Sequence, residues 1–242
     1  MTRSAIIIIT LFLVLVVHNE SFSQQIIHKE LDLSQDLSIW YDSVAGLDNT
    51  VLRQGVLADL ERKALRTHPF LYDYKWQLGD VLYQEQQFKN VRLLYNIEED
   101  LLITMGEGLS PYTQFIELKS DRISNFRIRH SMYIWVNESI QGNNSGFYEI
   151  LFEGAQFDLL AKRTKTLNLN GTEFIYDQKD QYFIHYNDEY FVIRNSGDLA
   201  RKFKSNRRRI KEFARQNQIR KLNAQVDSEF VELLKFCDNL EL

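Results

Sequence analysis

Short apolar runs separated by polar turns fill the middle of the chain. Between Trp76 and Met105, β-branched and aromatic runs alternate with turns rich in Gln, Glu and Asn, a pattern typical of antiparallel strands joined by hairpins. The pattern continues further along the chain and predicts strands at 115–118, 123–128, 132–136, 147–152, 157–163, 182–186 and 189–193. We therefore expect an antiparallel meander of roughly ten strands.

The turns between these strands carry their own signals. Gln84 to Gln87 separates the first two runs, and Asn170-Gly171 and Asn187-Asp188 are strong turn dipeptides. Many strands are apolar on both faces: Phe147 and Leu151 lie on one side of a strand whose other side carries Tyr148. In a sheet with one face exposed to solvent, apolar and polar residues would alternate more regularly along each strand. We therefore expect a curled sheet or a half-closed or closed barrel, partly covered by helices.

Helical periodicity occurs at both ends of the strand-rich region. Apolar positions between 51 and 66 fit a helical stripe, which the His68-Pro69 pair would end. After residue 195, amphipathic helices are expected to begin at Ser196 as N-cap, near Asn206, and at Asp227 as N-cap. The expected fold is α+β, with an antiparallel meander followed by C-terminal amphipathic helices that pack on it.

The first residues have the features of a secretory signal peptide. Arg3 gives a basic start, the run from Ala5 to Val17 is apolar and uncharged, and Ser21 and Ser23 suit cleavage before Gln24. The run is shorter than the roughly 18–20 residues that span a bilayer. We expect a signal peptide at 1–23, an N-terminal segment with the meander at 24–195, and helices of the same domain at 196–242. No second long apolar stretch follows, so no transmembrane segment is expected after cleavage.

Charge is segregated along the chain. Lys and Arg number 29 against 33 acids, and without Arg3 and Glu20 the mature chain has 28 and 32. Ten of the basic residues lie between Arg201 and Lys221, where Glu212 is the only acid. The remainder of the mature chain therefore has 18 basic residues and 31 acids.

This basic run is the best candidate for a binding surface. Its basic residues cannot all lie on the buried side of a helix whose apolar stripe is Ile210, Phe213 and Ala214. A patch for an anionic partner would comprise Arg207, Arg208, Arg209, Lys211 and Arg215. Nucleic acid is disfavoured because the protein is expected to be exported and no aromatic residue interleaves the exposed basic positions. Lipid headgroups are disfavoured because the apolar stripe is narrow. The interpretation that we favour at this point is pairing with the protein's own acidic remainder.

Metal and cofactor sites find little support in the sequence. The mature chain has His28, His68, His130 and His185, and no two of them have the i,i+3 or i,i+4 spacing of helical ligands. The Gly106-Glu107-Gly108 stretch lacks the lysine and the strand–loop–helix context of a phosphate loop. We expect no metal and no cofactor.

Catalytic patterns are equally sparse. The chain has no Gly-x-Ser-x-Gly elbow, and Cys237, its only cysteine, falls on the apolar face of the last helix as a buried, inert thiol. A disulfide within one chain is therefore impossible. The acids at 98–100 and Asp188-Glu189 are paired, but they occur at predicted turns, where we expect solvated carboxylates rather than catalytic ones.

Several segments together resemble an uncharacterised exported family of Bacteroidota. The resemblance begins near Asn49, and its segments are His68-Pro69-Phe70, Gly79 to Tyr83, Phe88 to Tyr95, Asp100, Gly146 to Gly154 and Arg209 to Phe213. It implies a Gram-negative periplasmic or extracellular setting, and it implies no activity, ligand or catalytic residue. The chain departs from the family at Glu85-Gln86-Gln87, where a glycine would be expected in the turn.

Two functions of different class are compatible with these patterns. The first is an exported, non-enzymatic binding or structural module, whose partner is an unidentified protein or an anionic envelope component. The alternative is a hydrolase acting on an envelope or extracellular polymer. A hydrolase would need a deep pocket lined by a buried carboxylate or histidine.

Overall fold

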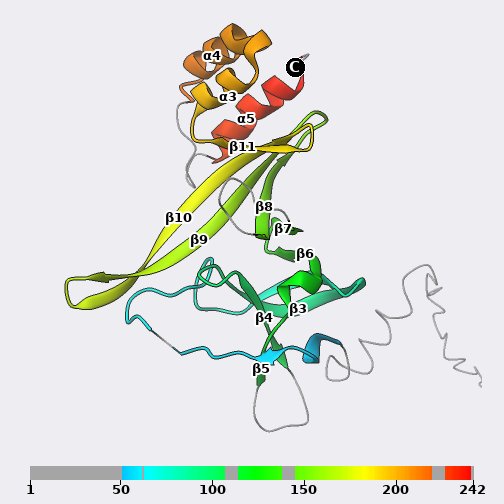
Figure 1. Cartoon of the computed structure of the whole chain (residues 1–242), viewed down its shortest axis with the longest axis vertical. Coiled ribbons are helices and arrows are strands. Elements are labelled where there is room, and N and C mark those ends of the chain that lie inside the picture. Colours follow the sequence, from blue (N-terminus) through cyan, green and yellow to red (C-terminus); the bar gives the residue numbers. More distant parts are fainter. Residues whose placement is uncertain (1–50, 62, 107–113, 138–144, 220–226, 241–242) are drawn as a thin grey trace, which may run out of the picture. The chain divides into compact units, whose positions relative to one another are not determined.

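A single antiparallel sheet forms the centre of the protein (Figure 1). The structure is a computed structural model, and it describes residues 51–61, 63–106, 114–137, 145–219 and 227–240. The expected signal peptide and the segment up to residue 50 lie outside the described residues. All described residues belong to one compact unit, Ser38–Leu242.

Eleven strands are present in the described residues, close to the number that the sequence predicts. Their bounds are β1 (Val56–Leu57), β2 (Gln77–Tyr83), β3 (Gln86–Asn96), β4 (Leu101–Gly106), β5 (Gln114–Glu117), β6 (Ile123–Ile128), β7 (Ser131–Val136), β8 (Gly146–Glu153), β9 (Asp158–Asn170), β10 (Glu173–Tyr186) and β11 (Glu189–Ile193).

The strand order is β1-β5-β4-β3-β2-β6-β7-β8-β9-β10-β11. It therefore consists of two meanders, β2 to β5 and β6 to β11, which are joined where β6 returns to pair with the free side of β2. The predicted meander is confirmed, with two departures from sequential pairing among the described strands: this return connection and the pairing of β1 with β5. The sheet does not close, because β1 and β11 end the order and each pairs with one neighbour, β5 and β10.

Two turns use left-handed backbone to join their strands. Gln84 and Glu85 have φ of 50° and 66°, and Asn187 and Asp188 have φ of 51° and 58°. These are the signs of a two-residue hairpin turn whose twist matches the twist of the strands. The second turn confirms its prediction. The first is made without the glycine that such a turn favours, so the Gln84-Glu85 pair carries some backbone strain.

The sheet curls so that the turn between β3 and β4 meets β9. The amide of Lys165 donates to the carbonyl of Ile97 over 3.2 Å, and the Lys165 ammonium donates to the carbonyls of His68 and Phe70. One core lies between β2, β3, β6, β7 and β8, with Tyr95 and Phe126 among its buried rings. The curl explains why both faces of these strands are apolar, as the sequence indicated.

The C-terminal helices form a second core with the last strands. α3 (Ser196–Lys202), α4 (Arg207–Gln216) and α5 (Asp227–Asp238) pack against β9, β10 and β11 through buried residues such as Leu199, Ile210 and Leu233. Three short 3-10 turns, η2 (Val51–Arg53), η3 (Ser120–Arg122) and η4 (Lys204–Asn206), complete the described elements. The helices begin within one residue of the predicted positions. Asn195 rather than Ser196 caps α3, accepting from the Asp198 amide, and Asp227, expected as an N-cap, is the first residue of α5.

The end of α5 is anchored to the turn between β8 and β9. The Asp238 carboxylate accepts hydrogen bonds from the amides of Ala155 and Gln156, both over 2.8 Å. The Gln156 side chain in turn donates to the carbonyl of Leu240 over 2.7 Å. The helices are therefore part of the same folded unit as the sheet.

The helix predicted over 51–66 is wrong. The structure has only η2 and the short strand β1 in its described part, and Val56 and Leu57 of the proposed stripe are 60% and 68% exposed. Gly55 lies so close to the sheet that an added Cβ would be 2.1 Å from the carbonyl oxygen of Glu117. Pairing with β5 therefore replaces the helical conformation that the periodicity favoured.

A buried ion pair joins the two sides of the curl. The Lys162 ammonium of β9 lies 2.6 Å from the Asp100 carboxylate in the turn between β3 and β4, with 8% and 24% of the two side chains exposed. Asp100 also accepts from the Tyr95 hydroxyl and from the amide of Phe147. Burial, and then the nearby Asp100 charge, raise the pKa of Tyr95 well above its ordinary range, so this hydroxyl remains a donor. We call these contacts the Asp100 clasp.

Breaking the Asp100 clasp from one side should destabilise the protein. Asp100 has φ of 59°, which asparagine tolerates, so Asp100→Asn removes the charge with little backbone cost. We expect a loss of about 3 kcal/mol, because Lys162 is left buried without its counter-charge. Urea unfolding monitored by circular dichroism measures this loss. The double variant Asp100→Asn with Lys162→Met should recover most of it, and equal losses in the single and double variants would contradict the role of the ion pair.

Candidate functional site

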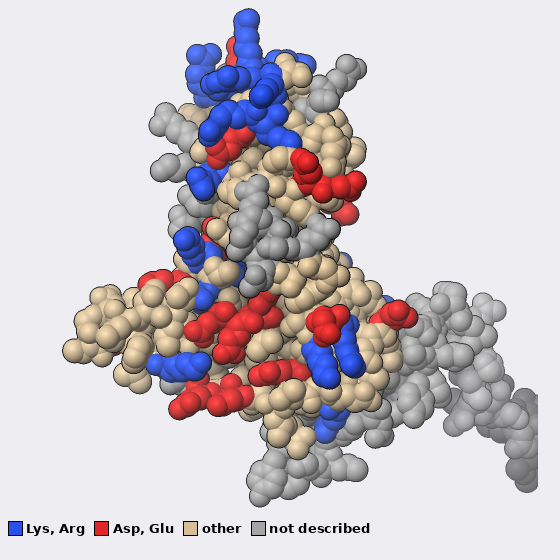
Figure 2. Space-filling model, viewed as in Figure 1, with Lys and Arg blue, Asp and Glu red and all other residues tan. Residues whose placement is uncertain are grey.

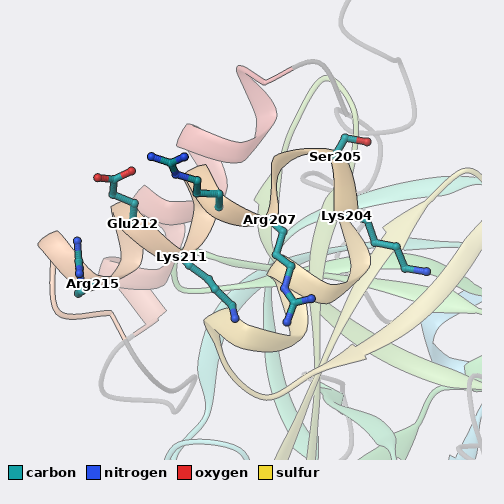
Figure 3. A pocket seen from close by; sticks show the side chains of 7 residues that line it. Lys204, Ser205, Arg207, Lys211, Glu212 and Arg215 are labelled. Carbon is teal, nitrogen blue, oxygen red and sulfur yellow. The ribbon is translucent and has the colours of Figure 1, made fainter.

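A cationic groove lies over α4 and the 3-10 turn that precedes it (Figure 3). Its volume is about 650 Å³. The side chains that line it are Lys204, Ser205, Arg207, Arg208, Lys211, Glu212 and Arg215. Four of the five residues that the sequence singled out therefore line one groove. The fifth, Arg209, is exposed on the same helix but does not line the groove.

Packing of the apolar stripe fixes which side of α4 faces solvent. Ile210 and Ala214 are buried in the core beneath the helices, and Phe213 stacks on Phe236 of α5 with ring centroids 4.2 Å apart. With these positions inward, Arg207 and Lys211 project outward on one side of the helix (Figure 3). The amphipathic pattern of the sequence thus places the basic residues at the surface.

The basic residues of the patch are not neutralised by the acids that the structure describes. Among the described residues, none of the five patch residues has an acidic partner within ion-pairing distance. Other basic residues of the helices are paired, such as Arg201 with Asp198 and Lys235 with Glu232. Figure 2 shows Lys and Arg gathered over the helices, while acids predominate on the sheet. The internal pairing that the sequence favoured is therefore absent for this patch within the part of the chain that is described.

No protein-family model, curated protein or solved structure matches this chain. The resemblance to an exported family of Bacteroidota stays a prediction. The case for a function therefore depends on the geometry of the candidate sites.

A second polar site is formed by side chains of β8, β9 and β10. Arg163 of β9 contacts Glu149 of β8 and Asp180 of β10, each with nitrogen and oxygen 2.7 Å apart. The Ser131 hydroxyl donates to the other oxygen of Glu149 over 2.5 Å, and Tyr72 donates to Ser131. Arg163, Glu149 and Asp180 expose 10% of their side chains or less. We call this chain of contacts the Arg163 network.

Two groups at the Arg163 network, Arg163 and the neighbouring Tyr133, have raised pKa values. Burial by itself would lower the pKa of Arg163, but the Glu149 and Asp180 charges outweigh it and raise that pKa. Burial, followed by the Glu149 charge, raises the pKa of the Tyr133 hydroxyl, which lies 3.4 Å from that of Tyr72. Sequence reasoning did not find this site. The signal was present as charged residues inside apolar strands, at Glu149 and Arg163.

The pocket beside this network has a volume of about 400 Å³, and Glu149 is one of the residues that line it. It therefore has the buried carboxylate that a hydrolase would require. However, Arg163 and Ser131 already occupy both oxygens of Glu149, so this carboxylate is not positioned to exchange a proton with a substrate. The geometry supports recognition at this pocket better than acid–base catalysis.

The other catalytic candidates are dispersed. Within the described ranges, no group of three or more His, Cys, Asp or Glu residues could hold a metal ion, and His28 lies outside those ranges. His185 stacks on Tyr190 and has its ring nitrogen 3.5 Å from Asp158. His68 and His130 lie elsewhere in the fold, and the Glu107-Gly108 part of the glycine stretch falls outside the described residues.

The acidic residues that the sequence places in turns differ in their exposure to solvent. Asp188 and Glu189 are exposed, as expected. Asp100 is not the solvated turn residue that the sequence predicts, because it is drawn into the clasp with Lys162. Its role there is structural, since its oxygens are occupied by protein donors. None of the helices that the structure describes combines the length and the apolar character needed to cross a membrane.

The thiol of Cys237 should react slowly in the folded protein. It is fully buried, and burial with the nearby Asp238 charge raises its thiol pKa from 9.0 to about 12. Because the folded state holds the proton more tightly, the stability linked to this thiol is present below about pH 9 and is lost as pH rises toward 12. At about pH 9, alkylation by iodoacetamide should be on the order of 100-fold slower in the native than in the urea-unfolded protein. Mass spectrometry over time measures both rates, and equal rates would show an accessible thiol.

Proposed function

We propose that this protein is an exported, non-enzymatic module, periplasmic or extracellular, that binds an anionic partner through the cationic groove of α4. The observation that carries the proposal is that the basic residues gather along one groove without ion pairs to described acids. A set of unpaired like charges raises the local potential and attracts ligands of opposite charge. The partner is an unidentified protein or an anionic envelope component.

The spacing of the basic residues supports an extended array of negative charges as the ligand. Arg207, Lys211 and Arg215 follow one another at intervals of four residues, and each interval advances the helix by about 6 Å. Carboxylates on every second residue of an extended strand are separated by about 6.6 Å, which is close to this interval. Repeating anionic groups of a polymer at similar intervals would match equally well.

The buried apolar stripe supports an aqueous partner rather than membrane insertion. Ile210 and Ala214 are covered by the core and Phe213 is partly buried against Phe236, so α4 presents no fully exposed large apolar side chain to a lipid surface. The groove is therefore best suited to a ligand that is held by charge. Such binding should weaken as salt rises, because exposed charges are screened over about 10 Å at 0.1 M ionic strength.

Charge reversal tests the groove. The triple variant Arg207→Glu, Arg208→Glu and Lys211→Glu should lose the captured partner almost completely in crosslinking pull-downs from native envelope extract. The expected loss is at least about tenfold in recovered partner, since attraction at three positions becomes repulsion. Quantitative mass spectrometry of the captured material measures it, at low and at high salt.

A matched control separates the groove from total charge. Lys89, Lys119 and Lys179 are exposed and lie on the sheet or its connections, outside the groove. Changing these three to Glu alters the net charge by the same amount and should leave capture within about twofold. If both triple variants capture the same components in the same amounts, the groove is not the binding surface.

A further inference from the structure

The pocket beside the Arg163 network is built from six separate segments of the chain. The loop before β2 provides Tyr72 and Asp73, the turn between β6 and β7 provides Arg129, and β7 to β10 provide the remaining polar groups. Its lining residues are Leu71, Tyr72, Asp73, Arg129, Tyr133, Glu149, Arg163 and Gln178. At about 400 Å³, the pocket falls toward the lower end of the range of small-molecule sites, roughly 300–1,000 Å³.

The floor of this pocket is rigid and polar. Glu149 is held by Arg163 and Ser131, and Arg163 is held by Glu149 and Asp180. A buried ion pair adds little net stability compared with apolar side chains of similar size, so stability alone is a weak reason for this arrangement. Polar groups that are fixed in advance at the base of a pocket do, however, reduce the cost of ordering a ligand there.

The formal charges that line the pocket cancel. Arg129 and Arg163 contribute two positive charges, and Asp73 and Glu149 contribute two negative ones. Arg129 also lies within 3.8 Å of Asp73 and has its guanidinium 4.3 Å from the centre of the Tyr72 ring. A ligand with a strong net charge would therefore meet repulsion as well as attraction.

The hydrogen-bonding groups favour a ligand that both donates and accepts. Arginine nitrogens and the Gln178 amide can donate, the carboxylates can accept, and the hydroxyls of Tyr72 and Tyr133 can do either. An apolar ligand would remove these groups from water without offering them a hydrogen bond, which costs free energy. Leu71 and the Tyr72 ring add an apolar wall on one side.

We infer that this pocket binds a neutral sugar unit. Each hydroxyl of a sugar is both donor and acceptor, and the C–H face of the ring is apolar, which together match the mixed polar lining and the Leu71–Tyr72 wall. A sugar carries no net charge, which suits the balanced lining. This inference is independent of the cationic groove, because the two sites share no residue.

Titration of the full chain with defined sugars tests the inference. Neutral hexoses, N-acetylhexosamines and their disaccharides serve as probes, with the amino acids glycine and alanine as zwitterionic comparisons. Saturation-transfer NMR should detect binding of at least one sugar with a Kd of about 1 mM or tighter. The amide signals of Tyr72 and Gln178 should shift on its addition.

Variants at the rim of the pocket connect binding to this site. Tyr72 and Gln178 are exposed, so Tyr72→Phe and Gln178→Ala should fold normally. Each should weaken sugar binding by about five- to tenfold, the effect of losing one hydrogen bond. Tyr74→Phe and Gln114→Ala make the same changes at exposed positions outside the lining and should leave binding unchanged.

Several results would overturn the inference. If no sugar in the panel binds at a sugar concentration of about 10 mM, ten times the expected Kd, the pocket does not bind a neutral sugar unit. Binding of the amino acids in place of sugars would exclude it as well. Equal affinities in the rim variants and their matched controls would place the sugar elsewhere on the protein. Because the rim variants leave the groove of α4 intact, loss of sugar binding with normal partner capture distinguishes this inference from the proposed function.

Discussion

The contact between Asp100 and Lys162 joins the two sides of the curled sheet. A meander of eleven strands can remain flat, twist open or curl, and local pairing does not choose among these forms. The clasp joins the turn after β3 to β9, so strands far apart in the order are drawn together. Gly146 makes room for it, because a Cβ there would lie 2.1 Å from the Asp100 carboxylate. The core around Tyr95 lies next to this contact, since the Tyr95 hydroxyl donates to Asp100.

Neighbouring residues of β9 serve different purposes because side chains of a strand alternate between its faces. Lys162 points to the Asp100 clasp, while Arg163 points to the pocket and is held by Glu149 and Asp180. Each buried basic residue has its own acidic partner, so neither leaves an uncompensated charge in a low-dielectric environment. One strand thereby supplies a structural contact on one face and the base of a candidate binding pocket on the other.

The buried ion pairs of the sheet involve acids that are then not available to the basic residues of α4. Asp100, Glu149 and Asp180 are committed to basic residues of β9. Meanwhile Ile210 and Phe213 determine the rotation of α4 through packing, and that rotation leaves Arg207 and Lys211 outward. The cationic groove thus follows from apolar packing beneath the helix, and the acids that the structure describes form no ion pair with its basic residues.

The sequence by itself determined the local elements, and the tertiary structure decided how they meet. Alternating apolar runs and the Asn187-Asp188 turn were sufficient to predict the strands, and the stripe of α4 was sufficient to predict the exposed basic residues, because both depend on periodicity within one segment. The same reasoning failed at 51–66, where contact with β5 outweighed a helical pattern. In the long hairpin of β9 and β10 it predicted the Asn170-Gly171 turn and the strand residues far from that turn, but not the polar strand residues between them, which have little strand signal. The sequence could not show that Asp100 and Glu149 are paired with Lys162 and Arg163, because the partners of a buried charge depend on how the strands pair and how the sheet curls.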